Sequence, residues 1–175
     1  EHNVRIGENC SIGSFVIIKN ALLENNIHIK DGVKIGSKGF GFIPNKSKNY
    51  RIPHIGRVLL KKGVEIGSGS TVDRGSITDT IVGENTFVDN LVQIAHNVRL
   101  GRNCVIAGQS GVAGSSTLGD FVVVGGQTAI AGHLTIGNEV TIAGKSGVTR
   151  DRPKVGIYGG IPAVPINQWR RQVGV

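Results

Sequence analysis

The chain is poor in several residue types, and each shortage argues against a class of protein. Its 175 residues include 5 Pro, 2 Cys, 1 Trp and no Met, and only 5% are aromatic. Cys10 and Cys104 are too few and too far apart for a disulfide framework, so we expect a reducing compartment. No stretch approaches the roughly 20 apolar residues of a transmembrane helix. Scarce aromatic residues and scattered basic residues disfavour nucleic-acid binding.

The charge balance is basic. Lys and Arg together number 20 and Asp and Glu number 12, which leaves a net charge of +8. Such an excess raises the expectation of an acidic partner, with an ordinary solvated basic surface as the alternative.

Aliphatic residues recur at every sixth position over a long stretch of the chain. Most are followed by Gly or Ala. An amphipathic helix would need apolar spacings of three and four, and a two-faced strand a spacing of two. The period is that of a hexapeptide repeat, which predicts an all-β solenoid with one inward aliphatic side chain per step. The series comprises Val82, Val88, Ile94, Leu100, Ile106, Val112, Leu118, Val124, Ile130, Ile136, Ile142 and Val148.

The interruptions of this period divide the chain. We expect a solenoid core over residues 1–155, with a loop ejected at 39–54, where aliphatic spacing gives way to turn residues and charge. A smaller phase slip falls at 76–80. Residues 156–175 are expected to form a C-terminal extension, in which 166–171 could begin a helix after Pro165.

His96 is the first candidate for chemistry. It stands two positions after the inward Ile94, so its imidazole should project outward. Imidazole gains and loses a proton near neutral pH, which suits a general base, although a plain surface histidine is an equal alternative. His133 is the second candidate. The remaining histidines have no short-range spacing typical of metal ligands, and no metal is expected.

Several ordered motifs carry a family resemblance. The chain resembles UDP-3-O-acylglucosamine N-acyltransferases of lipid A biosynthesis over nearly its whole length. Hexapeptides alone are shared by many acyltransferases, whereas the combination of motifs in this order is specific. The matching segments are 39–42, 52–58, 64–67, 71–75, 89–90, 93–97, 132–133 and 159–162.

The resemblance implies an architecture and a reaction. The fold would be a left-handed parallel β-helix assembled as a homotrimer, with active sites between neighbouring subunits and a cytoplasmic location. The reaction would transfer a 3-hydroxyacyl group from acyl carrier protein to the 2-amine of a UDP-3-O-acyl-glucosamine, without a covalent acyl-enzyme. No cofactor is expected, because 4'-phosphopantetheine arrives on the carrier protein.

The resemblance also assigns roles to residues. His96 would be the base, with Asp89 orienting it. The N–H of Gly114, one 18-residue coil further on, would stabilise the oxyanion. His133 lies 37 residues beyond His96 and would bind substrate in the same groove.

Two further groups are expected to contact ligands. Asn90, Gln93 and Asn97 would hydrogen-bond in the groove, with a structural role in the turns as the alternative. Arg150, Arg152 and Lys154 would contact the carrier protein or its phosphate arm, with a solvated surface as the alternative.

One departure from the family pattern and three rival functions stay open. We expect this chain to lack the uridine-binding domain that family members carry, and therefore to form a folded trimer whose catalysis is impaired. The rivals are an O-acyltransferase acting on UDP-N-acetylglucosamine, a metal-dependent hydratase and a non-catalytic scaffold. The residues around His96 favour the N-acyltransferase over the first of these.

Overall fold

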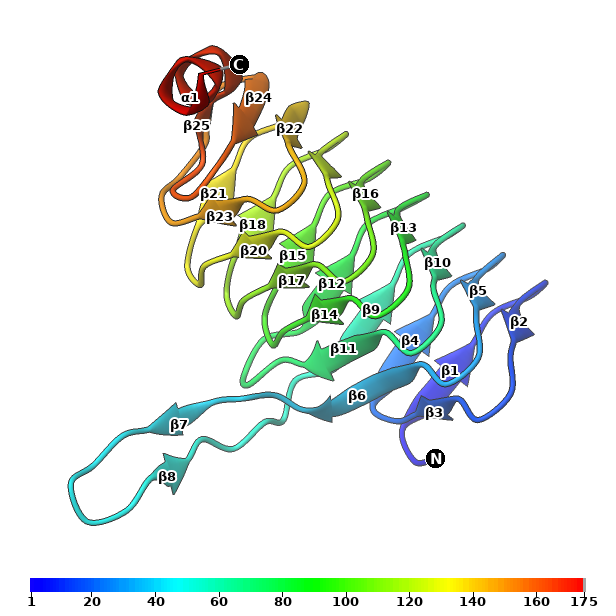
Figure 1. Cartoon of the computed structure of the whole chain (residues 1–175). Helices are drawn as coiled ribbons and strands as arrows, with labels where there is room; N and C mark the ends of the chain where they lie inside the picture. The colour runs from blue at the N-terminus through cyan, green and yellow to red at the C-terminus, as the bar shows by residue number, and fades with distance from the viewer. Residues whose placement is uncertain (175) are drawn as a thin grey trace.

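The structure is a computed structural model that describes residues 1–174 and shows a long parallel β-solenoid (Figure 1). Three sheets run along its length, two of seven strands and one of nine, and a two-stranded hairpin stands apart from them. The N-terminus lies at one end of the solenoid and the helix α1 at the other. The expected all-β parallel solenoid with a short C-terminal helix is confirmed.

Each sheet collects one short strand from most coils. The first contains β1 (Val4–Ile6), β4 (Ala21–Leu23), β9 (Val58–Leu60), β12 (Thr80–Val82), β15 (Arg99–Leu100), β18 (Thr117–Leu118) and β21 (Thr135–Ile136). The second contains β2 (Ser11–Ile12), β5 (His28–Ile29), β10 (Glu65–Ile66), β13 (Phe87–Val88), β16 (Val105–Ile106), β19 (Val123–Val124), β22 (Val140–Ile142), β24 (Gly156–Gly159) and β25 (Val164–Pro165). The third contains β3 (Ile17–Ile18), β6 (Lys34–Lys38), β11 (Thr71–Arg74), β14 (Gln93–Ile94), β17 (Gly111–Val112), β20 (Ala129–Ile130) and β23 (Gly147–Val148).

The six-residue period arises from how the coils stack. Gln93 pairs with Gly111 and Gly111 with Ala129, so equivalent residues of successive coils lie above one another. The residue after each points inward, and Ile94, Val112 and Ile130 are at most 2% exposed. The aliphatic series therefore forms a continuous column of buried side chains, each contributing about 1.5–3 kcal/mol by its burial.

A hairpin leaves the solenoid between β6 and β9. It consists of β7 (Phe42–Ile43) and β8 (Tyr50–Arg51), paired antiparallel, and projects sideways (Figure 1). Just before the hairpin, Gly36 has φ +82° and forms a bulge in β6 opposite β11, where the chain turns away from the sheet. The chain rejoins the sheet only at β9, so the excursion is longer than the expected 39–54.

The phase slip expected at 76–80 is a widened coil. Thr71 pairs with Gln93, 22 residues further on, whereas the next coils repeat every 18 residues. The extra residues bulge between β11 and β12, where Asn97 of the following coil holds them.

The solenoid ends beyond the expected boundary at residue 155. β24 still pairs in parallel with β22, and β25 then turns back antiparallel against β24. The helix α1 (Ile166–Val173) follows directly and packs on β24 and β25, with Trp169 against Gly160. Among residues 1–174, no helix has the length and apolar character that crossing a membrane would require.

Candidate active site

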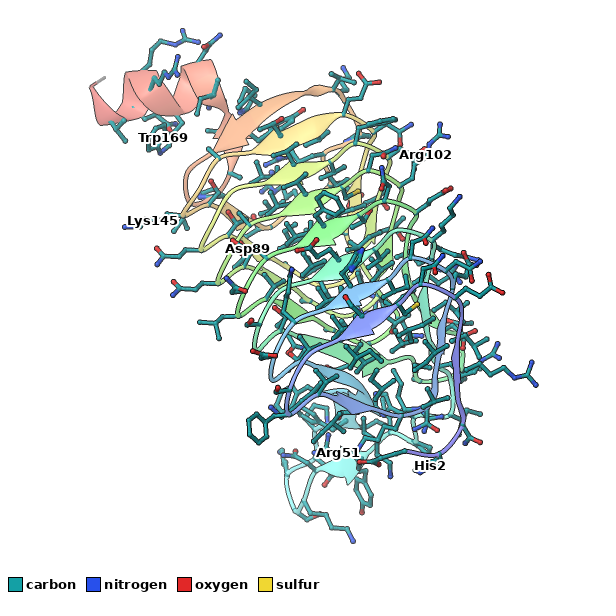
Figure 2. All side chains as sticks on the ribbon, turned by 90° about the vertical axis from the view of Figure 1, so that its right-hand side faces the viewer. His2, Arg51, Asp89, Arg102, Lys145 and Trp169 are labelled. Carbon is teal, nitrogen blue, oxygen red and sulfur yellow. The ribbon has the colours of Figure 1, made fainter. Side chains whose placement is uncertain are left out.

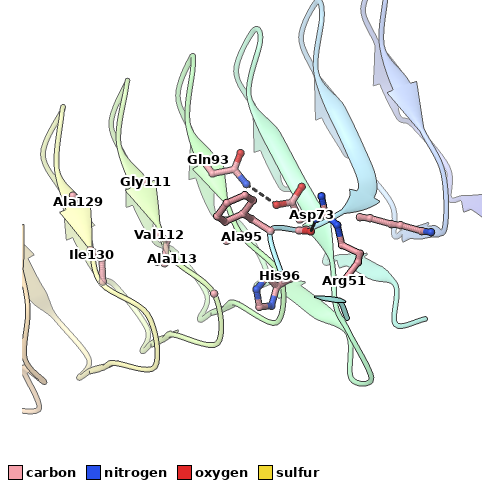
Figure 3. Close-up of a pocket in the computed structure, with 14 residues that line it drawn as sticks. Arg51, Asp73, Gln93, Ala95, His96, Gly111, Val112, Ala113, Ala129 and Ile130 are labelled. Carbon is pink, nitrogen blue, oxygen red and sulfur yellow. Dashed lines mark hydrogen bonds between the residues drawn. The ribbon is translucent and has the colours of Figure 1, made fainter. Parts of the chain in front are cut away.

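A hollow of about 700 Å³ opens beside the third sheet, where the stem of the hairpin meets the four successive coils that contain β11, β14, β17 and β20 (Figure 3). Its wall is mostly apolar, with small residues on β17 and β20 and the Phe40 ring from the hairpin stem. Its polar side chains are Lys38, Arg51, Asp73, Gln93 and His96. Acidic, basic and apolar groups therefore meet in one concave surface, which is typical of a binding site.

His96 lies at the corner that follows β14 and is clamped between two glycines. A Cβ built on Gly39 would lie 2.7 Å from the His96 Cβ, and one built on Gly114 would lie 2.7 Å from both Cε1 and Nε2. Neither glycine could carry a side chain without moving the ring. The sequence prediction that His96 projects outward agrees with this position.

Asn97 fixes which nitrogen of His96 bears the proton. Its Oδ1 accepts hydrogen bonds from the Ser76 N–H at 3.0 Å and Ser76 Oγ at 2.9 Å, and its Nδ2 donates to the Thr78 carbonyl at 2.9 Å. These partners determine the orientation of the amide. His96 Nδ1, 3.0 Å from Oδ1, must then donate to it, so Nε2 carries the lone pair.

His54, from the returning arm of the hairpin, packs behind His96. The two ring centroids are 5.3 Å apart in an edge-to-face arrangement, and His54 is 3% exposed. Its Nδ1 donates to the Ile52 carbonyl at 2.9 Å, which leaves Nε2 as an acceptor that has no partner within residues 1–174. Burial lowers the pKa of His54, and the charges of His96 and nearby arginines act in the same direction. Although the hydrogen bond to Ile52 raises the pKa, the net effect favours the neutral form of His54, which packs against the His96 ring.

Asp73 is the acidic group of the hollow. It follows the inward Val72 on β11, and its Oδ2 accepts a hydrogen bond from Gln93 Nε2 at 2.8 Å (Figure 3). Gln93 is in turn held by the Thr71 hydroxyl. Burial raises the pKa of Asp73 to about 6, against the opposing effects of the Gln93 hydrogen bond and the His96 charge.

The expected pairing of Asp89 with His96 is wrong within the chain. The Asp89 carboxylate accepts hydrogen bonds from the Gly108 N–H at 2.9 Å and from the N–H of Asn90 at 2.7 Å, at the corner that precedes β14. Figure 2 shows Asp89 well away from Arg51, which lines the hollow. Asn90 likewise caps a turn, because its Oδ1 accepts from the Ser68 N–H at 2.6 Å.

His133 stands one residue out of phase with His96. The His133 N–H donates to the Gly114 carbonyl, and the Ser115 N–H donates to the His96 carbonyl, so His133 stacks above the positions of Ser115 and Asn97. It is exposed at a corner with φ +61° and does not line the hollow. Within a single chain His133 therefore lies outside this hollow, and its predicted role in substrate binding stays a prediction.

The other residues predicted for the site lie partly in the hollow and partly outside it. Gln93 and Gly114 line the hollow, and Asn97 holds His96 from behind. Arg152 is tied to the Ala163 carbonyl and stacks on Tyr158 with 5.2 Å between guanidinium and ring centroid, so it braces the end of the solenoid. Arg150 and Lys154 are exposed.

Sequence reasoning missed five residues of the site, four of which belong to the hairpin stem. A stem without periodicity gives no indication of where it folds back. Asp73 could have been found, because it directly follows the inward Val72 and lies one widened coil before Ala95, next to His96. The missed residues are Lys38, Phe40, Arg51, His54 and Asp73.

No three His, Cys, Asp or Glu side chains gather within residues 1–174 as a metal site would require.

A family model described as "Bacterial transferase hexapeptide (six repeats)" matches residues 79–114. Among solved structures, the UDP-N-acetylglucosamine acyltransferase of Francisella novicida aligns with a TM-score of 0.84 at 22% identity, over 98% of this chain and 63% of that one. The UDP-N-acetylglucosamine acyltransferase from Campylobacter jejuni aligns with a TM-score of 0.80 at 25% identity, over 97% and 66%. The repeat and the fold together define a hexapeptide-repeat solenoid of the kind seen in these two acyltransferase structures.

Two curated relatives identify the family to which the chain belongs. The UDP-3-O-acylglucosamine N-acyltransferase of Azorhizobium caulinodans is 53% identical over 158 residues, and that of Methylobacterium nodulans is 47% identical over 156. These alignments cover 90% and 89% of the chain and 44% of each relative, so the chain spans less than half their length. Over the segment that it spans, the chain belongs to the UDP-3-O-acylglucosamine N-acyltransferase family.

Proposed function

We propose that the complete protein transfers a 3-hydroxyacyl group from acyl carrier protein to the 2-amine of a UDP-3-O-acyl-glucosamine. The observation that carries the proposal is His96, whose Nε2 lone pair is held in an apolar hollow by the Asn97 hydrogen bond to Nδ1. The names of the curated relatives support the same reaction.

His96 serves as the general base. A glucosamine ammonium has no lone pair with which to attack, so it must first give a proton to Nε2 of His96. The free amine nitrogen then forms a bond to the thioester carbon. As the carbon–sulfur bond breaks, the nitrogen loses a second proton, which passes to the leaving thiolate, and His96 afterwards releases its own proton to solvent. The products are an amide and a free thiol.

Gly114 supplies the donor for the developing oxyanion. Its N–H donates no hydrogen bond within residues 1–174, whereas the neighbouring Ala113 and Ser115 amides are paired between coils. The position against the His96 ring places this amide beside the base. A pre-oriented backbone donor of this kind contributes about 3 kcal/mol in acyl transfer.

The apolar wall accommodates the acyl chain. Phe40, Ala113 and Ala129 line it, and the small residues of β17 and β20 keep it open, whereas Val112 and Ile130 point into the core. Arg150 and Lys154 attract the acidic carrier protein, and they add to a net charge of +8. Three copies of the chain would place this hollow beside a neighbouring subunit and complete the site.

The test is product analysis with the complete protein, an acyl carrier protein thioester and two acceptors. UDP-3-O-acyl-glucosamine offers an amine, and UDP-N-acetylglucosamine offers a hydroxyl. We expect an amide from the first and no ester from the second by mass spectrometry. Ester formation with the second acceptor alone would favour the O-acyltransferase, and no product from either would favour a non-catalytic scaffold.

A further inference from the structure

Asp73 is a carboxylate without a cationic partner in a hollow that also contains cations. The ion pairs within residues 1–174 join Lys30 to Glu65, Arg57 to Asp79, Lys61 to Glu24 and Arg102 to Asp120, and none of them includes Asp73. Its Oδ2 accepts one hydrogen bond, from Gln93, and its Oδ1 accepts none within the same residues.

The groups around Asp73 explain why it stays unpaired. On the neighbouring β6 its ladder partner is Ser37, followed by Lys38 at the edge of the hollow. Arg51 donates to the Gly39 carbonyl at 3.1 Å. Arg74 points the other way and donates to the carbonyls of Gly56 and Ile55. The two arginines are thus engaged with backbone, and the charged or titratable groups that share the hollow with Asp73 are Lys38, Arg51 and His96.

Asp73 and His96 face the same space from adjacent coils. The β11–β14 register runs from Thr71 opposite Gln93 to Val72 opposite Ile94, which brings Asp73 level with the small Ala95, next to His96. Adjacent strands lie about 4.8 Å apart. Figure 3 shows the Asp73 carboxylate and the His96 ring on the wall of one hollow. A single small polar group could therefore contact both.

We propose that Asp73 binds the positively charged amine of the acceptor and selects an amine over a hydroxyl. The inference rests on the proposed function. An ammonium carries three N–H groups and a positive charge, so it can donate to Asp73 Oδ1 and to His96 Nε2 at once. A neutral hydroxyl has one proton and can satisfy only one of them, which leaves the carboxylate in a half-apolar hollow without a counter-charge.

The hydrogen bond to Asp73 also holds the amine in place while it gives a proton to His96. The ammonium gives one proton to His96 Nε2 and keeps an N–H bonded to Asp73, so the lone pair appears while the nitrogen is held in place. Asp73 is needed as a carboxylate. Burial raises its pKa to about 6, so the preference for the amine should weaken as the pH falls through this value.

The experiment compares acceptor binding in the complete protein. The probes are UDP-3-O-acyl-glucosamine and its analogue with a hydroxyl in place of the amine, the second measured as an inhibitor. Asp73→Asn keeps an oxygen for Gln93 and removes the charge. The control is Asp120→Asn, because Asp120 binds Arg102 at a different corner. The readouts are KM for the amine, the inhibition constant for the hydroxyl analogue, and both again between pH 5 and 8.

We expect Asp73→Asn to raise KM for the amine between roughly 10- and 100-fold and to leave the inhibition constant of the analogue within about threefold. The pH dependence of the preference should disappear, while Asp120→Asn behaves as wild type. An unchanged KM in Asp73→Asn, with normal amide formation by wild type, would overturn this inference alone. A wild-type protein that forms no amide would overturn the proposed function and this inference with it.

Discussion

Substitution of Asn97 tests how the site is held together, because this one side chain hydrogen-bonds both to His96 and to the widened coil. Its amide contacts His96, Ser76 and Thr78, and its backbone is left-handed at φ +61°. Replacing it with Gly removes the side chain and keeps the backbone conformation relaxed. Replacing it with Ala removes the side chain and adds backbone strain.

The magnitudes follow from these contacts. Asn97→Gly deprives the Ser76 N–H and the Thr78 carbonyl of partners, at about 1 kcal/mol each, so we expect a loss of about 2 kcal/mol in the free energy of unfolding. Asn97→Ala should cost about 1 kcal/mol more, because a left-handed backbone is unfavourable for a residue with a Cβ. The Ser76 amide should also exchange faster with solvent in both variants.

Asn103 provides the matched control. It has the same left-handed backbone, φ +54°, but its side chain makes one exposed hydrogen bond, from Asn85 at 3.2 Å. We expect Asn103→Gly to cost less than about 0.5 kcal/mol. Urea unfolding and amide hydrogen exchange measure these quantities. A loss in Asn97→Gly no larger than in Asn103→Gly would refute the role given to Asn97.

Three further predictions concern the glycines and the acid of the site. Gly114→Ala should lower kcat at least tenfold with little effect on folding, since its Cβ would displace the His96 ring; steady-state kinetics and circular dichroism check this. Gly36→Ala should prevent correct folding, because its Cβ would lie 1.6 Å from the Lys19 carbonyl oxygen; the fraction of soluble protein on expression measures it. Folding raises the pKa of Asp73 from 3.8 to about 6, so its stabilising contribution is complete below pH 3.8 and is lost as the pH rises through about 6. Asp73→Asn should therefore be more stable than wild type at pH 7, by about 1 kcal/mol after allowance for partial exposure, and equal stability at pH 7 and pH 4 would contradict this.

The solenoid could be predicted from the sequence because its core repeats. A column of inward aliphatic residues such as Ile94, Val112 and Ile130 needs the same residue type at the same phase in each coil, which leaves a visible period. The bulge at Gly36 has no such signal. It depends on one backbone conformation opposite β11, and the course of the hairpin follows from it.

The site was harder to predict because the hydrogen-bond partners of polar side chains at the corners of the coils depend on local backbone geometry, which leaves no period in the sequence. The outward direction of His96 followed from its phase, but Asp89 turned to nearby backbone amides and Asn97 became the partner of the ring. A one-residue difference in phase separated His133 from the hollow. The outward direction of Asp73 could be predicted from its place in the repeat. Its position in a hollow could not, because the hollow forms only where the hairpin stem folds over β11.

The most direct test of the central claim is the rate of amide formation at saturating substrates in the complete protein with His96→Ala, beside His133→Ala. If Nε2 of His96 removes the proton from the acceptor amine, His96→Ala should lower kcat by about 10²- to 10⁴-fold, and His133→Ala should lower it by much less. Retention of more than a tenth of wild-type kcat in His96→Ala would contradict the account.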